Sequence, residues 1–370
     1  MSFSIGNKGY IGCGANSTNL LNDFWEYDPV TNIWTQKADF GGTGRWLAVG
    51  LAIGNKGYIG LGNDGNFCQD FWEYDPSLNT WIQKSNFVGT GTWGSVAFSI
   101  FNKGYIATGS PSVSTYTNDL WEYDPFLNTW AQKANLPGVA RRCATGFSMG
   151  NKGYLGVGDD GMNLLQDFWE YDAILNFWSQ KTNFSGAKRG NAASFSICEK
   201  GYLGTGDRLG QPDLNDFWQF DASLNQWIQK ADFGGVIRDE TVYFSIGTNG
   251  YIGMGIDDTL SYLSDFWEYT PDSVCITGIQ EISNNNLQFI ISPNPAKEFI
   301  VCSLQFTGNE KINLSVTDVN GRKLISKQLE TVNSKLQTKI DVSAFSNGIY
   351  FVRLLTDDRK QKAVKKFLKE

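Results

Sequence analysis

The side chains with the clearest binding chemistry are arginines that recur at one place in an internal repeat. Counting thirteen residues back from the tyrosine of each Gly-Tyr pair, from the second repeat on, gives Arg45, Thr92, Arg141, Arg189 and Arg238. Beside them stand Trp46, Trp93, Arg142, Asp239 and Glu240. Guanidinium groups hold carboxylates through paired hydrogen bonds, and they stack on aromatic faces. The arginines and their neighbours form a candidate ligand-binding set, suited to carboxylates or sugars.

A second interpretation of the repeated arginines is structural. Each one would brace its own repeat by bonding loop carbonyls and nearby acidic side chains. A position that recurs in nearly every repeat favours this bracing role, whereas a ligand site is expected to break the repeat. The stronger ligand-binding candidates are therefore the residues that depart from the pattern: Thr92, Trp93, Arg142, Asp239 and Glu240.

The composition excludes several kinds of catalysis. The sequence has no histidine, which removes most metal sites, Ser-His-Asp triads and imidazole acid–base schemes. No other acid–base set is assembled, so no catalytic residue is predicted. The six cysteines are spread singly, which favours small buried apolar side chains over a disulfide framework. They are Cys13, Cys68, Cys143, Cys198, Cys275 and Cys302.

Acidic loops offer the one metal chemistry to weigh. They contain Asn63-Asp64-Gly65-Asn66, Asp159-Asp160-Gly161, Asp207-Arg208 and Asp257-Asp258. Calcium takes several oxygen ligands, but none of these loops has the spacing of a known calcium-binding loop. Asn, Asp and Gly are also the residues that turns select. Turn formation is the favoured interpretation, calcium is the alternative, and no other cofactor is expected.

A repeated β element must position these residues. The tryptophan of Asp-Phe-Trp-Glu-Tyr-Asp-Pro recurs, 47 to 49 residues apart, as Trp25, Trp72, Trp121, Trp169, Trp218 and Trp267. Short runs punctuated by Gly, Asn and Pro predict four strands per repeat; in the second repeat these are 46–53, 58–61, 70–75 and 81–84. A period of this length with several strands per unit indicates an all-β array such as a propeller.

The repeat resembles the kelch repeat of β-propellers, as in the central domain of galactose oxidase. The resemblance lies in an aromatic strand ending in Gly-x-Gly, where the family has a glycine doublet, and in aromatic pairs separated by six residues. The pairs are Tyr27/Trp34, Tyr74/Trp81, Tyr123/Trp130, Tyr171/Trp178 and Phe220/Trp227. The resemblance implies a six-bladed kelch-type β-propeller over residues 1–272.

Both ends of the repeat array are irregular. Aligned on the tyrosines, Met1 falls in the middle of the first strand of the other repeats, so we expect the first blade to be incomplete at its N-terminus. The sixth repeat stops after its third strand. Propellers commonly complete one blade with strands from both chain ends. We therefore expect a Trp-x-Gln-Lys-like strand, preceded by a signal peptide, upstream of Met1.

Charge separates the chain into two parts. From Leu287 onward there are 14 Lys and Arg against 8 Asp and Glu, which leaves 17 against 30 for the front part. An acidic surface repels phosphate backbones, so no nucleic acid is expected as a partner of the front part. No apolar run is long enough to span a membrane. Residues 273–288, where Asn and Ser accumulate, are expected to be a linker.

The last residues, 289–370, read as a small immunoglobulin-like β-sandwich of alternating strands. Their landmarks are Pro293, Asn294, Pro295, Gly321, Gly348, Tyr350, Lys365 and Lys366. In this order and spacing they resemble the C-terminal sorting domain of the type IX secretion system of Bacteroidetes. The resemblance implies binding to that secretion machinery, and release or attachment at the outer-membrane surface.

Three functions fit these observations. The first is a secreted or cell-surface binding module for a glycan, a peptide or a surface protein. The second is an enzyme: among kelch propellers, copper oxidases need histidine ligands and are excluded, whereas a sialic acid mutarotase would need only arginines and a carboxylate, such as Arg141, Arg189, Arg238 and Glu240. The third is a purely structural surface protein. Fold alone does not decide among them.

Overall fold

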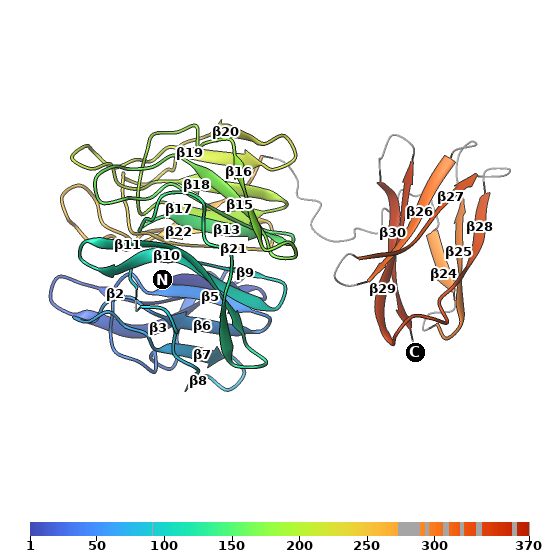
Figure 1. Cartoon of the computed structure of the whole chain (residues 1–370), viewed down its shortest axis with the longest axis horizontal. Helices are drawn as coiled ribbons and strands as arrows, with labels where there is room; N and C mark the ends of the chain where they lie inside the picture. The colour runs from blue at the N-terminus through green and yellow to red at the C-terminus, as the bar shows by residue number, and fades with distance from the viewer. Residues whose placement is uncertain are drawn as a thin grey trace. The chain divides into compact units, whose positions relative to one another are not determined.

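The computed structural model describes residues 1–90, 92–272, 289–292, 296–305, 311–318, 322–330, 335–356 and 361–369. The chain divides into two compact units, Met1–Cys275 and Ile276–Glu370. The described residues of both units form antiparallel β-sheets joined by turns and loops (Figure 1). The expectation of an all-β fold is confirmed.

The first unit contains six antiparallel sheets within its described residues, five of four strands and a last one of three. The first sheet contains β1 (Ser2–Ile5), β2 (Lys8–Ala15), β3 (Leu20–Asp28) and β4 (Ile33–Gln36). The second contains β5 (Val49–Ile53), β6 (Lys56–Gly60), β7 (Phe71–Asp75) and β8 (Thr80–Gln83). The third contains β9 (Val96–Ile100), β10 (Lys103–Ser112), β11 (Thr115–Asp124) and β12 (Thr129–Gln132). The fourth sheet contains β13 (Thr145–Met149), β14 (Lys152–Gly156), β15 (Phe168–Asp172) and β16 (Phe177–Lys181). The fifth contains β17 (Ala193–Ile197), β18 (Lys200–Gly204), β19 (Phe217–Asp221) and β20 (Gln226–Lys230). The sixth contains β21 (Val242–Ile246), β22 (Asn249–Gly253) and β23 (Phe266–Tyr269).

The six sheets follow one another around a closed ring. The first strand of each sheet contacts the first strand of the next, and β21 contacts β1. Two hydrogen bonds join the ends of the ring: Ser2 Oγ donates to the Tyr243 carbonyl at 2.7 Å and accepts from the Tyr243 N–H at 2.9 Å. This arrangement is that of a β-propeller-like fold, with the first strands innermost.

Alternation along the strands creates the core between neighbouring sheets. In β5, Val49, Leu51 and Ile53 are buried, as the two-residue period of a strand requires. Aromatic rings fill the space between sheets, since Phe24 of β3 packs against Tyr74 and Trp81 of the next sheet with ring centroids 4.8 and 5.0 Å away. Such pairs stabilise beyond the area they bury.

The first and last sheets of the array differ from the sheets between them. Strand β1 has four residues, whereas the corresponding inner strands have five, and β23 is the last strand described in the first unit. The expected linker, residues 273–288, lies outside the described residues.

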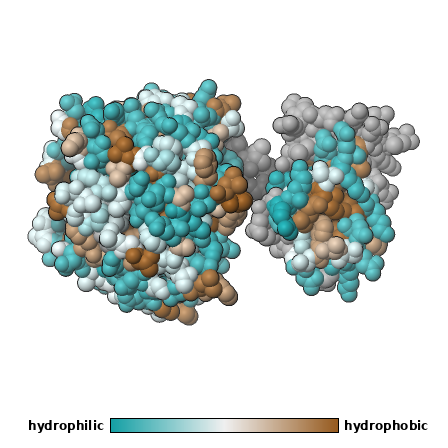
Figure 2. Space-filling model, in the orientation of Figure 1, coloured by the Kyte–Doolittle hydropathy of each residue, from teal (hydrophilic) through white to brown (hydrophobic). Residues whose placement is uncertain are grey.

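The second unit consists of two sheets. One contains β24 (Phe289–Ser292), β25 (Phe299–Gln305) and β28 (Lys335–Asp341), and the other β26 (Lys311–Asp318), β27 (Lys323–Glu330), β29 (Gly348–Thr356) and β30 (Gln361–Lys369). Ile300 and Ile340 of the first sheet belong to the same buried cluster as Leu314 and Val352 of the second. Figure 2 shows apolar residues gathered in the middle of the face of this unit that is turned to the viewer.

The cysteines are of two kinds. Cys13, Cys68, Cys143 and Cys302 are free, and burial raises the pKa of the Cys302 thiol to about 12. Cys198 is disulfide-bonded. The prediction of a small apolar cysteine is therefore wrong for Cys198, because single spacing in the sequence does not reveal which cysteines meet in space. Cys275 lies outside the described residues.

Candidate functional site

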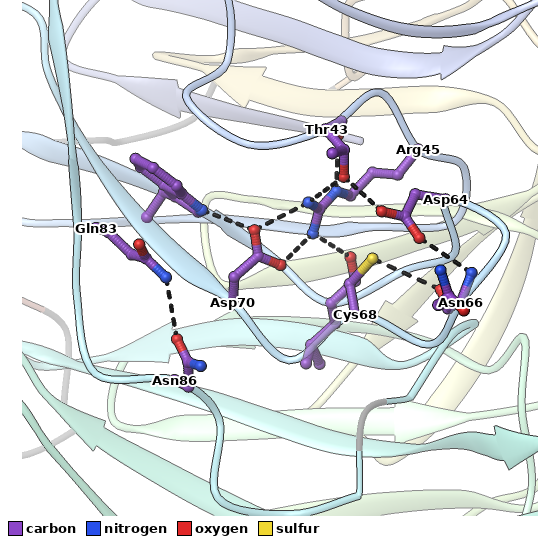
Figure 3. Close-up of polar contacts among 10 residues, drawn as sticks. Thr43, Arg45, Asp64, Asn66, Cys68, Asp70, Gln83 and Asn86 are labelled. Carbon is purple, nitrogen blue, oxygen red and sulfur yellow. Dashed lines mark hydrogen bonds and ion pairs between the residues drawn. The ribbon is translucent and has the colours of Figure 1, made fainter.

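The contacts of Arg45 are typical of the repeated arginines. Its guanidinium lies against Asp70, with Nη1 2.5 Å from Oδ1 and Nη2 2.9 Å from Oδ2 (Figure 3). Its Nε donates to the Thr43 carbonyl, and Nη1 donates to the Leu61 carbonyl. The side chain is only 1% exposed. A guanidinium with so many of its donors occupied by its own repeat has little left to offer a ligand.

The same arrangement occurs three more times, with the guanidinium side chains fully buried: Arg141 with Asp167, Arg189 with Asp216 and Arg238 with Asp265. Each aspartate also accepts the indole N–H of the tryptophan two residues later, at 2.7 Å. Burial raises the pKa of Asp167 and Asp216, but the hydrogen bonds and charge of their arginines outweigh it, so both pKa values are lowered. This geometry supports the bracing role for the four arginines rather than ligand binding.

The third repeat breaks this pattern. Thr92 takes the place of the arginine, is buried, and lies with its Oγ1 2.5 Å from Ser95 Oγ. Asp119 still accepts the Trp121 indole N–H at 2.7 Å, but no arginine pairs with it among the described residues. The change lies next to Trp93, and the hairpin β10–β11 of this sheet is also longer than the β6–β7 hairpin. The break in the repeat at Thr92, visible in the sequence, is thus accompanied by a local change in structure.

The residues after the bracing position gather at one end of the ring. They directly precede the inner strands, which all run in the same direction, so they share one end of a central cavity of about 840 Å³. Leu47, Cys143, Asn191 and Glu240 line it there, each in the left-handed backbone conformation, with φ between 48° and 51°. We call this end the mouth.

One half of the mouth is aromatic and cationic. The Trp46 and Trp93 rings stack with centroids 5.6 Å apart, and the Arg142 guanidinium lies 4.7 Å from the Trp93 centroid. The ring centroid of Tyr116, on β11, lies 5.5 Å from the same guanidinium. Asp159 accepts a hydrogen bond from the Arg142 Nε–H at 3.0 Å. Trp46 is 37% exposed. These rings and the guanidinium form a stacked row with its Trp46 end open to solvent.

The other half of the mouth is acidic. The Asn191 amide lies 3.4 Å from both Asp207 and Asp239. Burial, and then the charges of Glu240 and other carboxylates, raise the pKa of Asp239 to about 8. Burial followed by the charge of Asp207 raises the pKa of Glu240, and burial also raises that of Asp207. With a pKa of about 8, Asp239 holds a proton near neutral pH and can both donate and accept hydrogen bonds.

Tyr243 lines the cavity. Its side chain comes from β21, and its hydroxyl hydrogen-bonds to Thr145 and Ser194 of two other sheets. Thr145 and Ser194 are in turn joined by a 2.5 Å hydrogen bond.

The acidic loops cap their own turns. Asn63 Oδ1 accepts the Gly65 N–H at 2.7 Å, and Asp159 Oδ1 accepts the Gly161 N–H at 2.5 Å. Asp257 accepts the Thr259 N–H at 2.8 Å. These contacts support turn formation. Within the part of the chain that the structure describes, no three His, Cys, Asp or Glu residues are grouped as a metal site would require.

The predicted sorting residues fall partly within the described strands. Gly348 and Tyr350 lie in β29, and Lys365 and Lys366 lie in β30. Tyr350 is buried and donates from its hydroxyl to the Ser346 carbonyl at 2.7 Å. Pro293, Asn294, Pro295 and Gly321 lie outside the described residues.

Several residues of the mouth were not anticipated from the sequence. Asn191 and Cys143 occupy the aligned positions but carry no unusual motif, and Tyr116 belongs to the lengthened hairpin. Asp159 and Asp207 were weighed only as turn or calcium residues. Aligning the loop positions repeat by repeat would have found Asn191 and Cys143, whereas the approach of Tyr116 to Arg142 depends on the length of the β10–β11 hairpin.

Comparison with known proteins supports the two-part organisation. The first unit has the all-β, propeller-like architecture described above, and the structure of YjhT is similar to this chain with a TM-score of 0.62 and 16% sequence identity, covering 74% of this chain and 95% of that one. Residues 291–370 match the family of secretion system C-terminal sorting domains. This C-terminal part is a sorting domain, as its motifs predicted. No curated protein sequence matches the chain.

The sorting domain supports export through the type IX system and implies secretion or display at the cell surface. It also implies contact with the type IX machinery. The described residues include no helix of the length and apolar character that membrane crossing requires.

Proposed function

We propose that this protein is a secreted or surface-displayed binding module that takes a carbohydrate at the mouth of its ring of sheets. The first unit, residues 1–272, would be a six-bladed kelch-type propeller. Residues 289–370 would be an immunoglobulin-like sandwich that delivers it, in a bacterium of the Bacteroidetes, to the outer surface. Delivery by a sorting domain explains why the part with diverse loops carries a second unit of a different kind.

The observation that carries the proposal is the loss of repeat symmetry at the mouth. Equivalent positions of successive sheets hold Trp46, Trp93, Arg142, Gly190 and Asp239. A residue needed only for folding would recur, as the bracing arginines do in four sheets. The mouth instead combines an aromatic row with a set of carboxyl groups, and this difference is what recognition of an asymmetric ligand requires.

Carbohydrate chemistry fits both halves of the mouth. The exposed Trp46 ring offers a flat apolar face on which the C–H face of a sugar can stack. Carboxyl and amide groups, here Asp239, Glu240 and Asn191, exchange hydrogen bonds with sugar hydroxyls. The cavity volume of about 840 Å³ falls within the range of small-ligand sites. A peptide would use the same row of rings and remains the competing ligand class in the test below.

A combined glycan and peptide array on the full chain tests the proposal. We expect binding to a subset of glycans, and we expect the doubly substituted chain Trp46→Ala/Trp93→Ala to lose it. The matched control is Phe126→Ala, since Phe126 is an exposed aromatic residue in the turn between β11 and β12. Binding to peptides alone would contradict the carbohydrate assignment. Unchanged glycan binding by the double variant would contradict the site.

The mutarotase-like alternative finds less support in the geometry. It would place Arg141, Arg189 and Arg238 with Glu240 around a sugar. The three guanidinium groups are instead buried and paired with their own aspartates, which leaves Glu240 without a free arginine among them. A nuclear magnetic resonance assay of anomer exchange on sialic acid distinguishes the two, and acceleration over buffer would favour the enzyme.

A further inference from the structure

The acidic half of the mouth gathers three carboxyl groups within reach of a ligand. Asn191 lies 3.4 Å from both Asp207 and Asp239, and the charge of Glu240 acts on Asp239. All three acidic side chains are partly exposed. Within the described residues, none of the three forms an ion pair. Because like charges repel one another and attract a cation, this half of the mouth suits a positively charged group.

The two cations that act on Asp207 and Glu240 have other partners. Arg142 pairs with Asp159, with Nη2 3.0 Å from Oδ2. The amino group of Met1 donates to a backbone carbonyl at 3.4 Å. Each lowers the pKa of the carboxyl group it acts on, but burial outweighs both, so the pKa of Asp207 and that of Glu240 are raised. The charges of the acidic half are therefore only partly offset.

A glycine leaves room beside one of these carboxyl groups. Gly190 holds the position that Trp46, Trp93 and Asp239 hold in other sheets. A Cβ at this position would lie 2.8 Å from Asp207 Oδ1, which is too close for the two atoms to coexist without movement. The glycine therefore keeps free, at the Asp207 carboxyl, the space that other sheets fill with a side chain.

A hydroxyl without a partner lies next to the same groups. Thr241 directly follows Glu240, and both line the central cavity. The Thr241 side chain is only 9% exposed, and its Oγ1 has no hydrogen-bond partner among the described residues. A buried hydroxyl left unpaired costs stability. A polar ligand at this wall of the cavity would supply the partner.

We propose that the mouth binds an oligosaccharide of amino sugars. One sugar ring stacks on Trp46. The ammonium group of another lies among Asp207, Asp239 and Glu240. This inference rests on the proposed carbohydrate function and names the class of sugar.

An ammonium group suits the acidic half for two physical reasons. It donates charge-assisted hydrogen bonds to the carboxyl groups, and its charge offsets the repulsion among them. An N-acetylated sugar carries no such charge, and an anionic sugar would add to the repulsion. The mouth should therefore distinguish sugars by the charge on their nitrogen.

Calorimetry on the full chain with two matched oligosaccharides tests this inference. The probes are the linear tetramers of glucosamine and of N-acetylglucosamine, which differ only in acetylation of the nitrogen. At mildly acidic pH, where the amines carry their charge, we expect the glucosamine tetramer to bind at least about tenfold more tightly, because hydrogen bonds between charged groups are the stronger ones. Equal binding, or tighter binding of the acetylated tetramer, would overturn the inference.

Variants locate the preference at the acidic half. Asp239→Asn and Glu240→Gln each remove a charge with little change of shape. Each should weaken the glucosamine tetramer about tenfold and change the affinity for the acetylated tetramer by less than about twofold. Asp232→Asn, a change at an exposed carboxylate outside the cluster, is the matched control and should leave both affinities unchanged. Thermal unfolding checks that each variant is folded.

Two further arms separate this inference from the proposed function. A tetralysine peptide has as many positive side chains as the glucosamine tetramer but no sugar, and equally tight binding of this peptide would overturn the amino sugar assignment. If both tetramers bind equally and both lose binding in Trp46→Ala/Trp93→Ala, the carbohydrate function stands and the amino sugar inference falls. If neither tetramer binds, the inference also falls, whereas the glycan array still decides the proposed function.

Discussion

At the scale of single residues, the buried arginines are the clearest case of a chemically capable group with a structural use. Arg189 places its guanidinium on Asp216 and on the Ala187 and Thr205 carbonyls. Arg189→Ala should lower the free energy of unfolding by about 2–4 kcal/mol, because it leaves a largely buried carboxylate without its partner. Urea denaturation followed by tryptophan fluorescence measures this. The exposed neighbour Lys188 is the control, and an equal effect of Lys188→Ala would contradict the bracing role.

The acidic half of the mouth predicts a pH dependence. The pKa of Asp239 is about 8 in the folded protein against 3.8 without perturbation. Because the folded pKa is the higher one, the protonated group favours the folded state, and this contribution is lost as pH rises from about 4 through about 8. Asp239→Asn cannot ionise, so it should exceed the original chain in stability by about 1–2 kcal/mol near pH 9 and by less near pH 5.

Denaturant midpoints at the two pH values check this prediction. Asp232→Asn, a change at an exposed carboxylate outside the cluster, serves as the control. A gain for Asp239→Asn that is the same at both pH values would show that the stabilisation does not come from suppressed ionisation.

Part of the site could be predicted from the sequence alone. The repeat made both interpretations of Arg45 and its equivalents available, but only burial and the approach of Asp70 separated them. The stacking of Trp46 on Trp93 joins loops of neighbouring sheets, 47 positions apart in sequence. Side-chain contacts of that kind depend on the tilt between sheets, which no local pattern encodes.

At the scale of elements, adjacent sheets meet through a glycine in the second strand and a phenylalanine of the preceding sheet. A Cβ on Gly201 would lie 2.0 Å from the Phe147 ring. Gly201→Ala should therefore destabilise the chain by about 1–3 kcal/mol through overpacking. Gly104→Ala is the matched control, because it would meet the flexible ends of Leu51 and Ile53 instead.

Thermal unfolding of both variants measures the difference. The double variant Gly201→Ala/Phe147→Leu should recover part of the loss, since the smaller side chain makes room. If Gly104→Ala were as costly as Gly201→Ala, backbone effects of replacing glycine would explain the result better than contact with the ring.

Strand positions were the most predictable elements. In the second repeat, the expected strands 70–75 and 81–84 correspond to β7 and β8. The first expected strand began too early, at position 46, because an apolar run does not reveal that residues 46–48 leave the sheet.

At the scale of the whole molecule, the two units carry separate tasks. Fusing residues 289–370 to a reporter with a signal peptide should bring that reporter to the surface of a bacterium that has a type IX system. The same reporter without these residues should stay in the periplasm. Protease accessibility on intact cells measures the difference. Equal surface exposure of both reporters would contradict the role of the sorting domain.

The central claim is that the mouth, where the repeat loses its symmetry, is the place of ligand binding. Hydrogen exchange of the full chain, with and without a glycan identified by the array, tests it most directly. We expect slower exchange in the segments around positions 46–47, 93–94, 142–143, 190–191 and 239–240, which precede the inner strands. Slower exchange confined to the opposite end of the ring, with these five segments unchanged, would contradict it.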